Sequence, residues 1–505
     1  MIHFGFRALE LTRTGGVVSM IFNDSIFTSA DASDFRRTLL PDGEARIRVT
    51  VIARTRCFEG KAVNGGVVVA VRGSQAGRPI RYVENHGRPP VELAGASIVA
   101  ESAESPVTVG RSELWVVECG HYVRLPHRPL FRPSPEALVL LDRFEECAAW
   151  DEFSRLTAEH GANWEMLSET RQFERWKEEQ RSTGFYVRLR DRSFTLLGLV
   201  VEGGQGLATA DDRRFVAAIR GTSEGERALA NQGRFEALVL DRSEPACLYR
   251  DRRTAGRAVE DALLDVAERF TNRELGWLKT GLIRTADLAD VVRRRLTPDE
   301  IHVGLASGPH FVPFEKGDDS VEDGGARWCR DNPLVIDWSV DSVGLLRRRA
   351  RQEQAYRTPY FRNEHLWGRD AVTWNKVASY LRARIMLDGT IPSDGAFFMR
   401  PVEPWLSSLA LLALLNASVA DFAVRTFLVS RMNTEVGGLR RLPIPILKNS
   451  EAEHLASLAA RAVAAKAALD RGEPSEPLAG IEAELDGYVR ELYGIRRDAD
   501  LWVVR

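Results

Sequence analysis

The sequence predicts an α/β chain in which an incomplete doubly wound sheet, with only its last strands present, precedes a helical linker, a mixed α+β region and C-terminal helices. Short, continuous apolar runs alternate with helix-periodic segments in residues 1–75, which is typical of buried strands joined by helices. These residues supply fewer strands than a complete sheet of this kind needs, and they begin with a helix. Two further helix-periodic segments, residues 451–470 and 478–493, close the chain.

The elements expected in the first part follow one another closely. Residues 2–11 are predicted to form a short amphipathic helix. Residues 17–22 (VVSMIF) are expected to form a buried strand because the run is short, continuous and rich in β-formers. A second helix is predicted at 32–40, and further strands at 46–53 and 67–71.

The later residues divide into three parts. Proline and glycine interrupt residues 76–130, and helical periodicity dominates from 136 to 181. Strand-like runs then continue to the segment LPIP (442–445), where two prolines enforce an extended exit. The predicted units are an α/β domain, a helical linker, a mixed α+β domain and a C-terminal helical segment, at residues 1–130, 131–190, 191–447 and 448–505.

Composition restricts the function classes. The chain has 505 residues, a formal net charge of -2 and a sequence pI near 6.6, so it has no overall positive field to attract nucleic acid. Any DNA contact must therefore come from a local patch. The five cysteines form no C-x-x-C pair, which argues against structural zinc and disulfide frameworks and fits a reducing compartment. We expect no metal site.

The sequence contains no segment typical of membrane insertion or secretion. The most apolar stretch, residues 409–415, is far shorter than the roughly 18 residues that span a bilayer. The N-terminal residues lack the basic head and small-residue cleavage site of a signal peptide. The sequence therefore predicts a cytoplasmic protein without a membrane partner.

Three separated segments resemble one enzyme family. The segment FGFRALELTRTGGVVSMIFNDSIFTSADASDFRRTLL (4–40) resembles the part of N6-adenine DNA methyltransferases that follows the catalytic motif. Residues 57–63 (CFEGKAV) resemble the family's late F-x-x-x-x-V segment. Residues 193–447 are similar to the target-recognition domain of large single-chain enzymes, including methyltransferases of BREX-type phage-defence systems. The matching pieces are 199–215, PFEKG (313–317), LVIDW (334–338), YF (360–361), TW (373–374), LLNA (414–417) and RLPIP (441–445), and residues 481–494 resemble the closing helix.

Two hallmarks of that family are not found in the sequence. These are the glycine-rich loop over which S-adenosylmethionine sits and the N-P-P-Y/F loop that holds the reacting amine. The nearest segments, GGQG (203–206) and DNPL (331–334), are better interpreted as a turn and a structural loop. The resemblance therefore implies the C-terminal part of a gamma-class enzyme, of the BREX-type or type IIG-like kind, with its target-recognition domain.

The resemblance also implies cofactors and partners. S-adenosylmethionine would be bound only through a partner chain that carries the N-terminal half of the methyltransferase, and no cofactor-binding residue is expected here. The other expected partners are double-stranded DNA and further subunits of a defence system.

Candidate catalytic residues follow from the same alignment of motifs. Phe58 occupies the aromatic position on which an extruded adenine would stack, although packing at the sheet edge is the alternative. Asp24 and Ser25 follow a predicted strand at its C-terminal end, which is the usual ligand side of doubly wound sheets. For this pair the alternative is a helix cap or turn.

A second group of candidates lies in the mixed region. Arginines and aromatics alternate between residues 347 and 369, and this mixture suits phosphate clamping and contact with base edges. A solvated helix face is the alternative for such a run. The predicted DNA-binding residues are Arg347, Arg348, Arg349, Arg351, Arg357, Tyr360, Arg362, Trp367, Arg369, Thr373, Trp374 and Lys376.

Three functional hypotheses follow. In the first, the chain is the C-terminal, target-recognition subunit of a split N6-adenine DNA methyltransferase and is inactive alone. In the second, it is a non-catalytic DNA-binding or scaffold subunit of a phage-defence complex. The third, an unrelated α/β enzyme, is disfavoured because no nucleophile–base set, P-loop or metal-ligand spacing is present.

Overall fold

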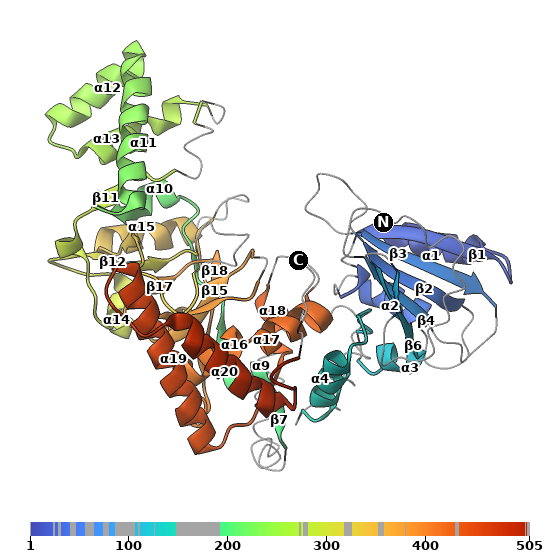
Figure 1. Ribbon diagram of the computed structural model, residues 1–505. Coiled ribbons are helices and arrows are strands. Elements are labelled where there is room, and N and C mark those ends of the chain that lie inside the picture. The colour runs from blue at the N-terminus through green and yellow to red at the C-terminus, as the bar shows by residue number, and fades with distance from the viewer. Residues whose placement is uncertain are drawn as a thin grey trace.

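The computed structural model describes residues 2–23, 26–28, 32–40, 47–55, 65–73, 80–85, 107–109, 112–125, 127–147, 192–271, 274–275, 281–317, 326–351, 358–378, 380–429, 434–499 and 501 (Figure 1). In Figure 1 the N-terminal sheet lies to the right and the C-terminal helices lie to the lower left, with α4 (Pro135–Glu145) between them.

Six described strands form the N-terminal sheet, in the order β1-β3-β2-β4-β6-β5. Their bounds are β1 (Val17–Asn23), β2 (Ile47–Thr55), β3 (Gly65–Arg72), β4 (Ile80–Asn85), β5 (Val107–Val109) and β6 (Ser112–Val117). Among these strands only β2 and β4 pair in parallel. This sheet is mixed, with β3 antiparallel to both of its neighbours, β1 and β2. The expected incomplete doubly wound methyltransferase sheet stays a prediction. Residues 56–64 between β2 and β3 are fewer than the dozen or so that a parallel crossover requires.

Strand β1 ends the sheet, and its residues alternate between the two faces. Val18 and Phe22 are buried, whereas Val17 is 64% exposed and Ile21 is 60% exposed. The prediction of a fully buried strand at 17–22 is therefore wrong, because the same run also fits the two-residue period of a half-covered edge strand. In the described part of the sheet, the outer edge of β1 has no pairing strand.

Helices α1 (Ile2–Leu11) and α2 (Ser33–Leu39) cover the face of the sheet on which Phe22 is buried. The ring of Phe35 packs against those of Phe22 and Phe6, with centroid separations of 5.3 and 5.2 Å. Arg36 of α2 is buried, and its Nε donates to the backbone oxygen of His127 at 2.9 Å. This contact ties α2 to the segment that leads into α4, after the short helix α3 (Cys119–Val123).

The region from residue 192 onward contains two larger sheets, ordered β11-β10-β13-β12-β17 and β16-β15-β18-β8, and two short strand pairs, β14 with β9 and β19 with β7. Their strands are β7 (Phe194–Leu196), β8 (Val201–Gly204), β9 (Leu207–Ala208), β10 (Val216–Ile219), β11 (Thr285–Ala286), β12 (Phe311–Glu315), β13 (Leu334–Asp337), β14 (Tyr360–Phe361), β15 (Ala371–Asn375), β16 (Ala383–Met386), β17 (Ile391–Pro392), β18 (Ala396–Pro401) and β19 (Pro443–Pro445). The pairing of β7 with β19 brings the two ends of this region together.

Several helices connect these strands. They are α9 (Leu197–Val200), α10 (Asp212–Phe215), η5 (Leu288–Asp290), α14 (Pro298–Val303), α15 (Val340–Arg351), η6 (Glu364–Leu366), α16 (Ser408–Asn416), α17 (Ser418–Ala423), η7 (Val424–Leu428) and α18 (Val436–Arg440). Helix α16 is apolar and largely buried, and it packs against α19 (Asn449–Asp470). Among the described residues no single helix is long and apolar enough to cross a membrane, and one bent pair, α16 with α17–η7, has the required length and composition.

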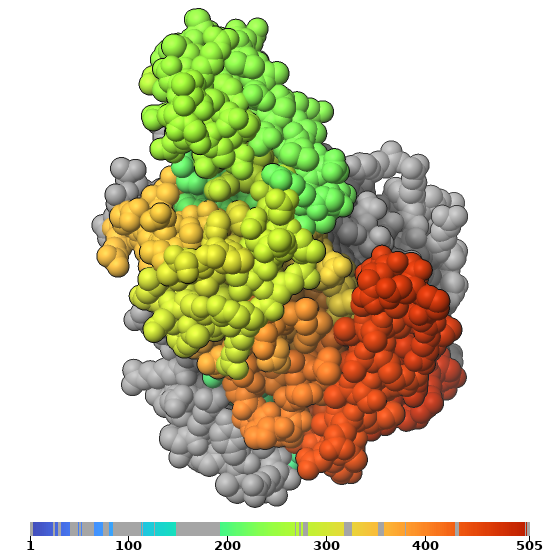
Figure 2. All heavy atoms as spheres, turned by 90° about the vertical axis from the view of Figure 1, so that its left-hand side faces the viewer, coloured from blue at the N-terminus to red at the C-terminus, as the bar shows by residue number. Residues whose placement is uncertain are grey.

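A helical module projects from the second region. It consists of α11 (Ser223–Leu240), α12 (Ser243–Thr254), α13 (Val259–Val266) and η3 (Ala267–Arg269), which lie between β10 and β11 in the sequence. Figure 2 shows it standing out from the body of the molecule. The module has its own buried cluster, which includes Phe235, Val239, Tyr249, Leu263 and Phe270.

The closing helices agree with the prediction. Helix α19 (Asn449–Asp470) and α20 (Leu478–Tyr493) match the expected segments 451–470 and 478–493. Tyr493 is buried, and its hydroxyl donates to the backbone oxygen of Pro443 at 2.7 Å. This bond attaches α20 to β19, where the second region ends.

Candidate nucleic-acid interface

The C-terminal end of α15 carries the densest group of predicted DNA-binding residues. Val343 and Leu346 bury one face of the helix, so the arginines of the last turns lie on the other faces. Arg348 and Arg351 are exposed to solvent. The structure therefore supports an accessible basic helix end here.

Two arginines of the same helix are instead held by carboxylates. Arg347 pairs with Glu364, and its guanidinium lies 4.4 Å from the centroid of the Phe361 ring. Arg349 lies 3.1 Å from the Asp211 carboxylate. Because these side chains have partners in the chain, their charges are partly neutralised, and they connect α15 to neighbouring loops.

The strand pair β9–β14 places a second set of polar groups beside α15. Arg362 follows β14, is exposed, and donates to the side chain of Gln205; its guanidinium lies 4.6 Å from the Tyr360 ring centroid. Asn363 adopts φ 56°, and its Nδ2 donates to the backbone oxygen of Gln205 at 3.0 Å. This left-handed residue turns the chain so that the two segments face each other.

A third group completes the surface. Lys316 Nζ lies 2.5 Å from Asp212 Oδ2, and the Tyr360 hydroxyl donates to Asp394 Oδ2 at 3.3 Å. Burial and the nearby charge of Asp212 raise the pKa of Asp394, against the lowering effect of the Tyr360 hydrogen bond and of Lys316. The sequence analysis missed Gln205, Lys316 and Asp394, because isolated polar residues in separate loops carry no local signal.

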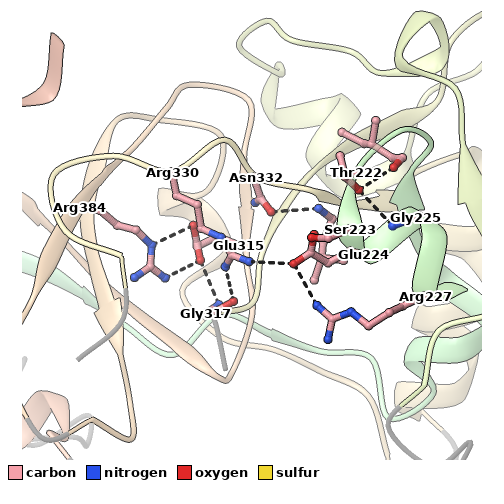
Figure 3. Close-up of polar contacts among 12 residues, drawn as sticks. Thr222, Ser223, Glu224, Gly225, Arg227, Glu315, Gly317, Arg330, Asn332 and Arg384 are labelled. Atoms are coloured by element: carbon pink, nitrogen blue, oxygen red, sulfur yellow. Dashed lines mark hydrogen bonds and ion pairs between the residues drawn. The ribbon is translucent and has the colours of Figure 1, made fainter. Parts of the chain in front are cut away.

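A buried ion pair joins Glu315, the residue before Lys316, to Arg384 (Figure 3). The Arg384 and Glu315 side chains are 0% and 5% exposed, with Arg384 Nη2 lying 2.6 Å from Glu315 Oε1. Glu315 Oε1 also accepts from the backbone N–H of Gly317 at 2.9 Å, and Arg330 Nη1 donates to the Gly317 oxygen at 2.5 Å. Gly317, the residue after Lys316, is thus bonded at both its N–H and its oxygen.

The same pair explains a pKa shift. Burial raises the pKa of Glu315, but the charge and hydrogen bonds of Arg384 and the Gly317 N–H outweigh that effect, so the pKa is lowered overall. Glu315 is therefore ionised at neutral pH. Arg330, which bonds the Gly317 oxygen, also lies near the helical module: its Nη2 is 3.9 Å from Glu224 Oε1, at the start of α11.

Three predicted DNA-binding residues are buried. Thr373 is 0% exposed and donates to the Phe397 oxygen, and Trp374 is 1% exposed and donates to the Thr434 oxygen. Trp367 is also 1% exposed and donates to the Arg362 oxygen. In this conformation these side chains pack the core and are not available to a duplex.

The remaining predicted residues have mixed positions. Lys376 is half-buried, with its Nζ 5.5 Å from the Phe397 ring centroid, and Arg369 is half-buried. Arg357 lies outside the described residues, as do the catalytic candidates Asp24, Ser25 and Phe58.

The glycine-rich turn at residues 203–206 does not fit a cofactor. A Cβ added at Gly203 would lie 2.1 Å from the Phe398 oxygen, and one at Gly206 would lie 2.0 Å from the Pro392 oxygen. The chain itself therefore fills the space next to these glycines. This turn is not assigned as a site for S-adenosylmethionine. In the segment DNPL (331–334), Asn332 Oδ1 accepts from the Leu334 N–H at 3.1 Å, as in a turn that leads into a strand.

Metal ligands in proteins are chiefly His, Cys, Asp and Glu side chains, and the described ranges contain residues of all four types. In that part of the chain no group of three His, Cys, Asp or Glu side chains is placed to hold a metal ion. The cysteines described there, Cys119, Cys147, Cys247 and Cys329, are all free thiols.

Comparison with known proteins gave no family, and the solved structures to which the chain is similar include two restriction enzymes. No protein-family model matches the chain, and no curated protein matches it. The type IIG restriction endonuclease BpuSI has 11% identity and a TM-score of 0.24, over 97% of this chain and 48% of that chain. The type IIL restriction-modification enzyme MmeI, solved in complex with DNA, has 10% identity and a TM-score of 0.42, over 98% and 48%. The chain spans about half the length of each, and both TM-scores are too low to establish a common fold.

Proposed function

We propose that this chain is the target-recognition subunit of a split, site-specific N6-adenine DNA methyltransferase in a restriction or phage-defence system. The observation that carries the proposal is that α15 exposes Arg348 and Arg351 while β14, which α15 contacts through Arg347 and Phe361, is followed by the exposed Arg362. The motifs of the chain resemble that enzyme family. Arginine forks bind phosphate oxygens and guanine edges.

The chemistry assigned to the chain is binding and positioning. Duplex DNA would lie against the interface, and the target adenine would be extruded from the stack so that its amine becomes reachable. Phe58 is proposed to stack on the extruded base, and Asp24 and Ser25 are the other proposed catalytic residues. S-adenosylmethionine supplies the methyl group when it is bound by the partner chain, and this chain contributes no residue to its binding.

The end strand of the N-terminal sheet supports the proposal that a partner chain docks on this one. Strand β1 exposes Val17 and Ile21, and the adjacent α1 exposes Phe4 and Leu11, at 83% and 71%. A strand at the end of a sheet that exposes apolar side chains can pair with a strand from another chain. Such pairing would hold the partner along β1, the strand that directly precedes Asp24 and Ser25 in the sequence.

The test is a tagged purification of the chain from its native cell, followed by duplex-binding and methyl-transfer assays. We expect salt-dependent duplex binding by the chain alone, and methyl transfer only when a co-purified chain with the cofactor and N-P-P-Y/F loops is present. Failure to bind any duplex at low salt would refute the recognition role. Tight S-adenosylmethionine binding and methylation by the chain alone would refute the split arrangement.

The partner surface has its own control. Val17→Lys with Ile21→Lys should abolish co-purification of the partner and leave duplex binding intact, whereas Leu229→Lys, at an exposed position on α11, should change neither. Retention of the partner by the double variant would show that β1 is not the docking edge.

The second candidate function is a non-catalytic DNA-binding or scaffold subunit. It is favoured by the filled glycine turn at 203–206, the segment nearest to a cofactor loop in the described part of the chain. Duplex binding without methyl transfer from any co-purified mixture would establish this alternative.

A further inference from the structure

We infer that four side chains on four segments, Gln205, Lys316, Arg362 and Asp394, form a readout cluster that contacts base edges and sets the recognised DNA sequence. The inference rests on the proposed function, since it assigns the specificity of that same interface. It distinguishes these residues from Arg348 and Arg351, which would contact phosphates.

The first argument is how the backbones are joined. The Gly206 N–H donates to the Ser393 oxygen at 3.1 Å, and the Asp394 N–H donates to the Leu207 oxygen at 3.1 Å. The Ser393 N–H donates to the Glu315 oxygen at 2.8 Å, and β14 pairs with β9. Four segments far apart in the sequence are thus joined by backbone pairing at the cluster residues or at their immediate neighbours in the chain.

The second argument is the chemistry of the four groups. Lys and Arg donate to guanine O6 and N7, Gln pairs with adenine N6 and N7, and Asp accepts from cytosine N4. A surface that only binds phosphates needs donors and gains nothing from a carboxylate such as Asp394, which would repel the backbone. The mixture of donors and an acceptor therefore fits base edges better than phosphates.

The third argument is that the present contacts are easily exchanged. The Lys316 and Asp212 side chains are 35% and 34% exposed, and Arg362 is exposed where it meets Gln205. Pairs in contact with water contribute little net stability, so a base edge can replace one partner without a large penalty. The Lys316–Asp212 pair and the Arg362–Gln205 bond can therefore be exchanged for contacts with DNA.

The fourth argument is rigidity beneath the cluster. The Gly317 N–H and oxygen are bonded to Glu315 and Arg330, and Glu315 is held in turn by the buried Arg384 (Figure 3). Gly317 has φ 82°, which favours glycine and shapes this turn. A fixed backbone under Lys316 is what precise contact with a base edge requires.

The experiment is selection of bound duplexes from a randomised pool by the purified full-length chain, with sequencing of the bound fraction. The variants are Asp394→Asn and Arg362→Ala, which lie on different segments, and Arg348→Ala is the matched control. We expect the wild type to enrich one sequence and each cluster variant to change the preferred base at one or two positions. Affinity for the original site should fall about 5- to 150-fold, and affinity for random duplex should fall by less than affinity for the original site.

The control separates the two kinds of contact. Arg348→Ala should weaken binding to all duplexes alike and leave the enriched sequence unchanged. If both cluster variants keep the wild-type sequence preference, the readout assignment is overturned. Wild-type binding without any sequence preference also overturns it while leaving duplex binding intact, whereas absence of all duplex binding refutes the proposed function itself.

Discussion

Replacement of Glu315 by alanine tests the buried ion pair beneath the interface. The carboxylate accepts from Arg384 at 2.6 and 3.4 Å and from the Gly317 N–H at 2.9 Å, and both charged side chains are almost fully buried. Without it, Arg384 retains the Asn375 side-chain oxygen at 3.1 Å as its remaining described side-chain partner. Removal of one member of a buried pair destabilises by about 3–5 kcal/mol, so Glu315→Ala should lower local stability by that amount.

Hydrogen exchange measured by mass spectrometry gives the local free energy of opening. Amides in β15, β16 and β18 that exchange by local opening should do so at least about 100-fold faster in Glu315→Ala. The double variant Glu315→Leu with Arg384→Met should recover most of the protection, because it leaves no unpaired buried charge. Equal protection in the wild type and in Glu315→Ala would refute the reasoning, since the pair would then contribute nothing to the stability of these strands.

The sign of the pH dependence follows from the lowered pKa of Glu315. A carboxyl group whose pKa is lower in the folded state stabilises fully above its unfolded pKa, which is about 4.3 for glutamate. That stability is lost as the pH falls through the lower, folded value. The difference in protection between wild type and Glu315→Ala should therefore be constant near neutral pH and should shrink only below about pH 4.

Three further predictions concern single side chains. Arg351→Ala should lower the magnitude of the salt slope of duplex binding by about 1, measured by fluorescence anisotropy over a salt series; an unchanged slope would exclude a phosphate contact. Asn416 accepts from the Ala383 N–H and donates to its oxygen, both at 2.9 Å, so Asn416→Ala should lower the urea midpoint by an amount equivalent to about 2–3 kcal/mol. Tyr493→Phe leaves the buried Pro443 oxygen without this donor and should destabilise by about 1–3 kcal/mol in the same assay, and an unchanged midpoint in either variant would contradict its assigned role.

The helices were predictable because their signals are local. In the segments at 2–11, 451–470 and 478–493 the apolar residues recur with the period of a helix. Each segment forms a helix in the structure, so tertiary contacts did not override this local preference. The strand at 17–22 was located correctly, but its environment was not. A short apolar run fits both a buried central strand and an edge strand, and only the pairing of β1 with β3 on one side decides between them.

The candidate interface was predictable only in part. The run of arginines indicated α15, but aromatic residues at helix or strand positions cannot be separated from core residues by type, so Trp367 and Trp374 were included although they are buried. Gln205 and Asp394 lie 189 residues apart and meet only through the folding of four chain segments. No local sequence pattern predicts contacts between segments so far apart in the chain.

The place of the helical module in the chain limits how it can be altered. Its two ends join β10 and β11, which pair in parallel, with Ala218 opposite Thr285 and Ile219 opposite Ala286. Parallel neighbours need a connection of about a dozen residues or more, so no tight turn can close this gap. A chain engineered without α11–α13 would therefore need a crossover linker of at least that length. Because the module has its own buried cluster, another self-contained domain of different shape could be grafted between the same two strands without disturbing the sheet below.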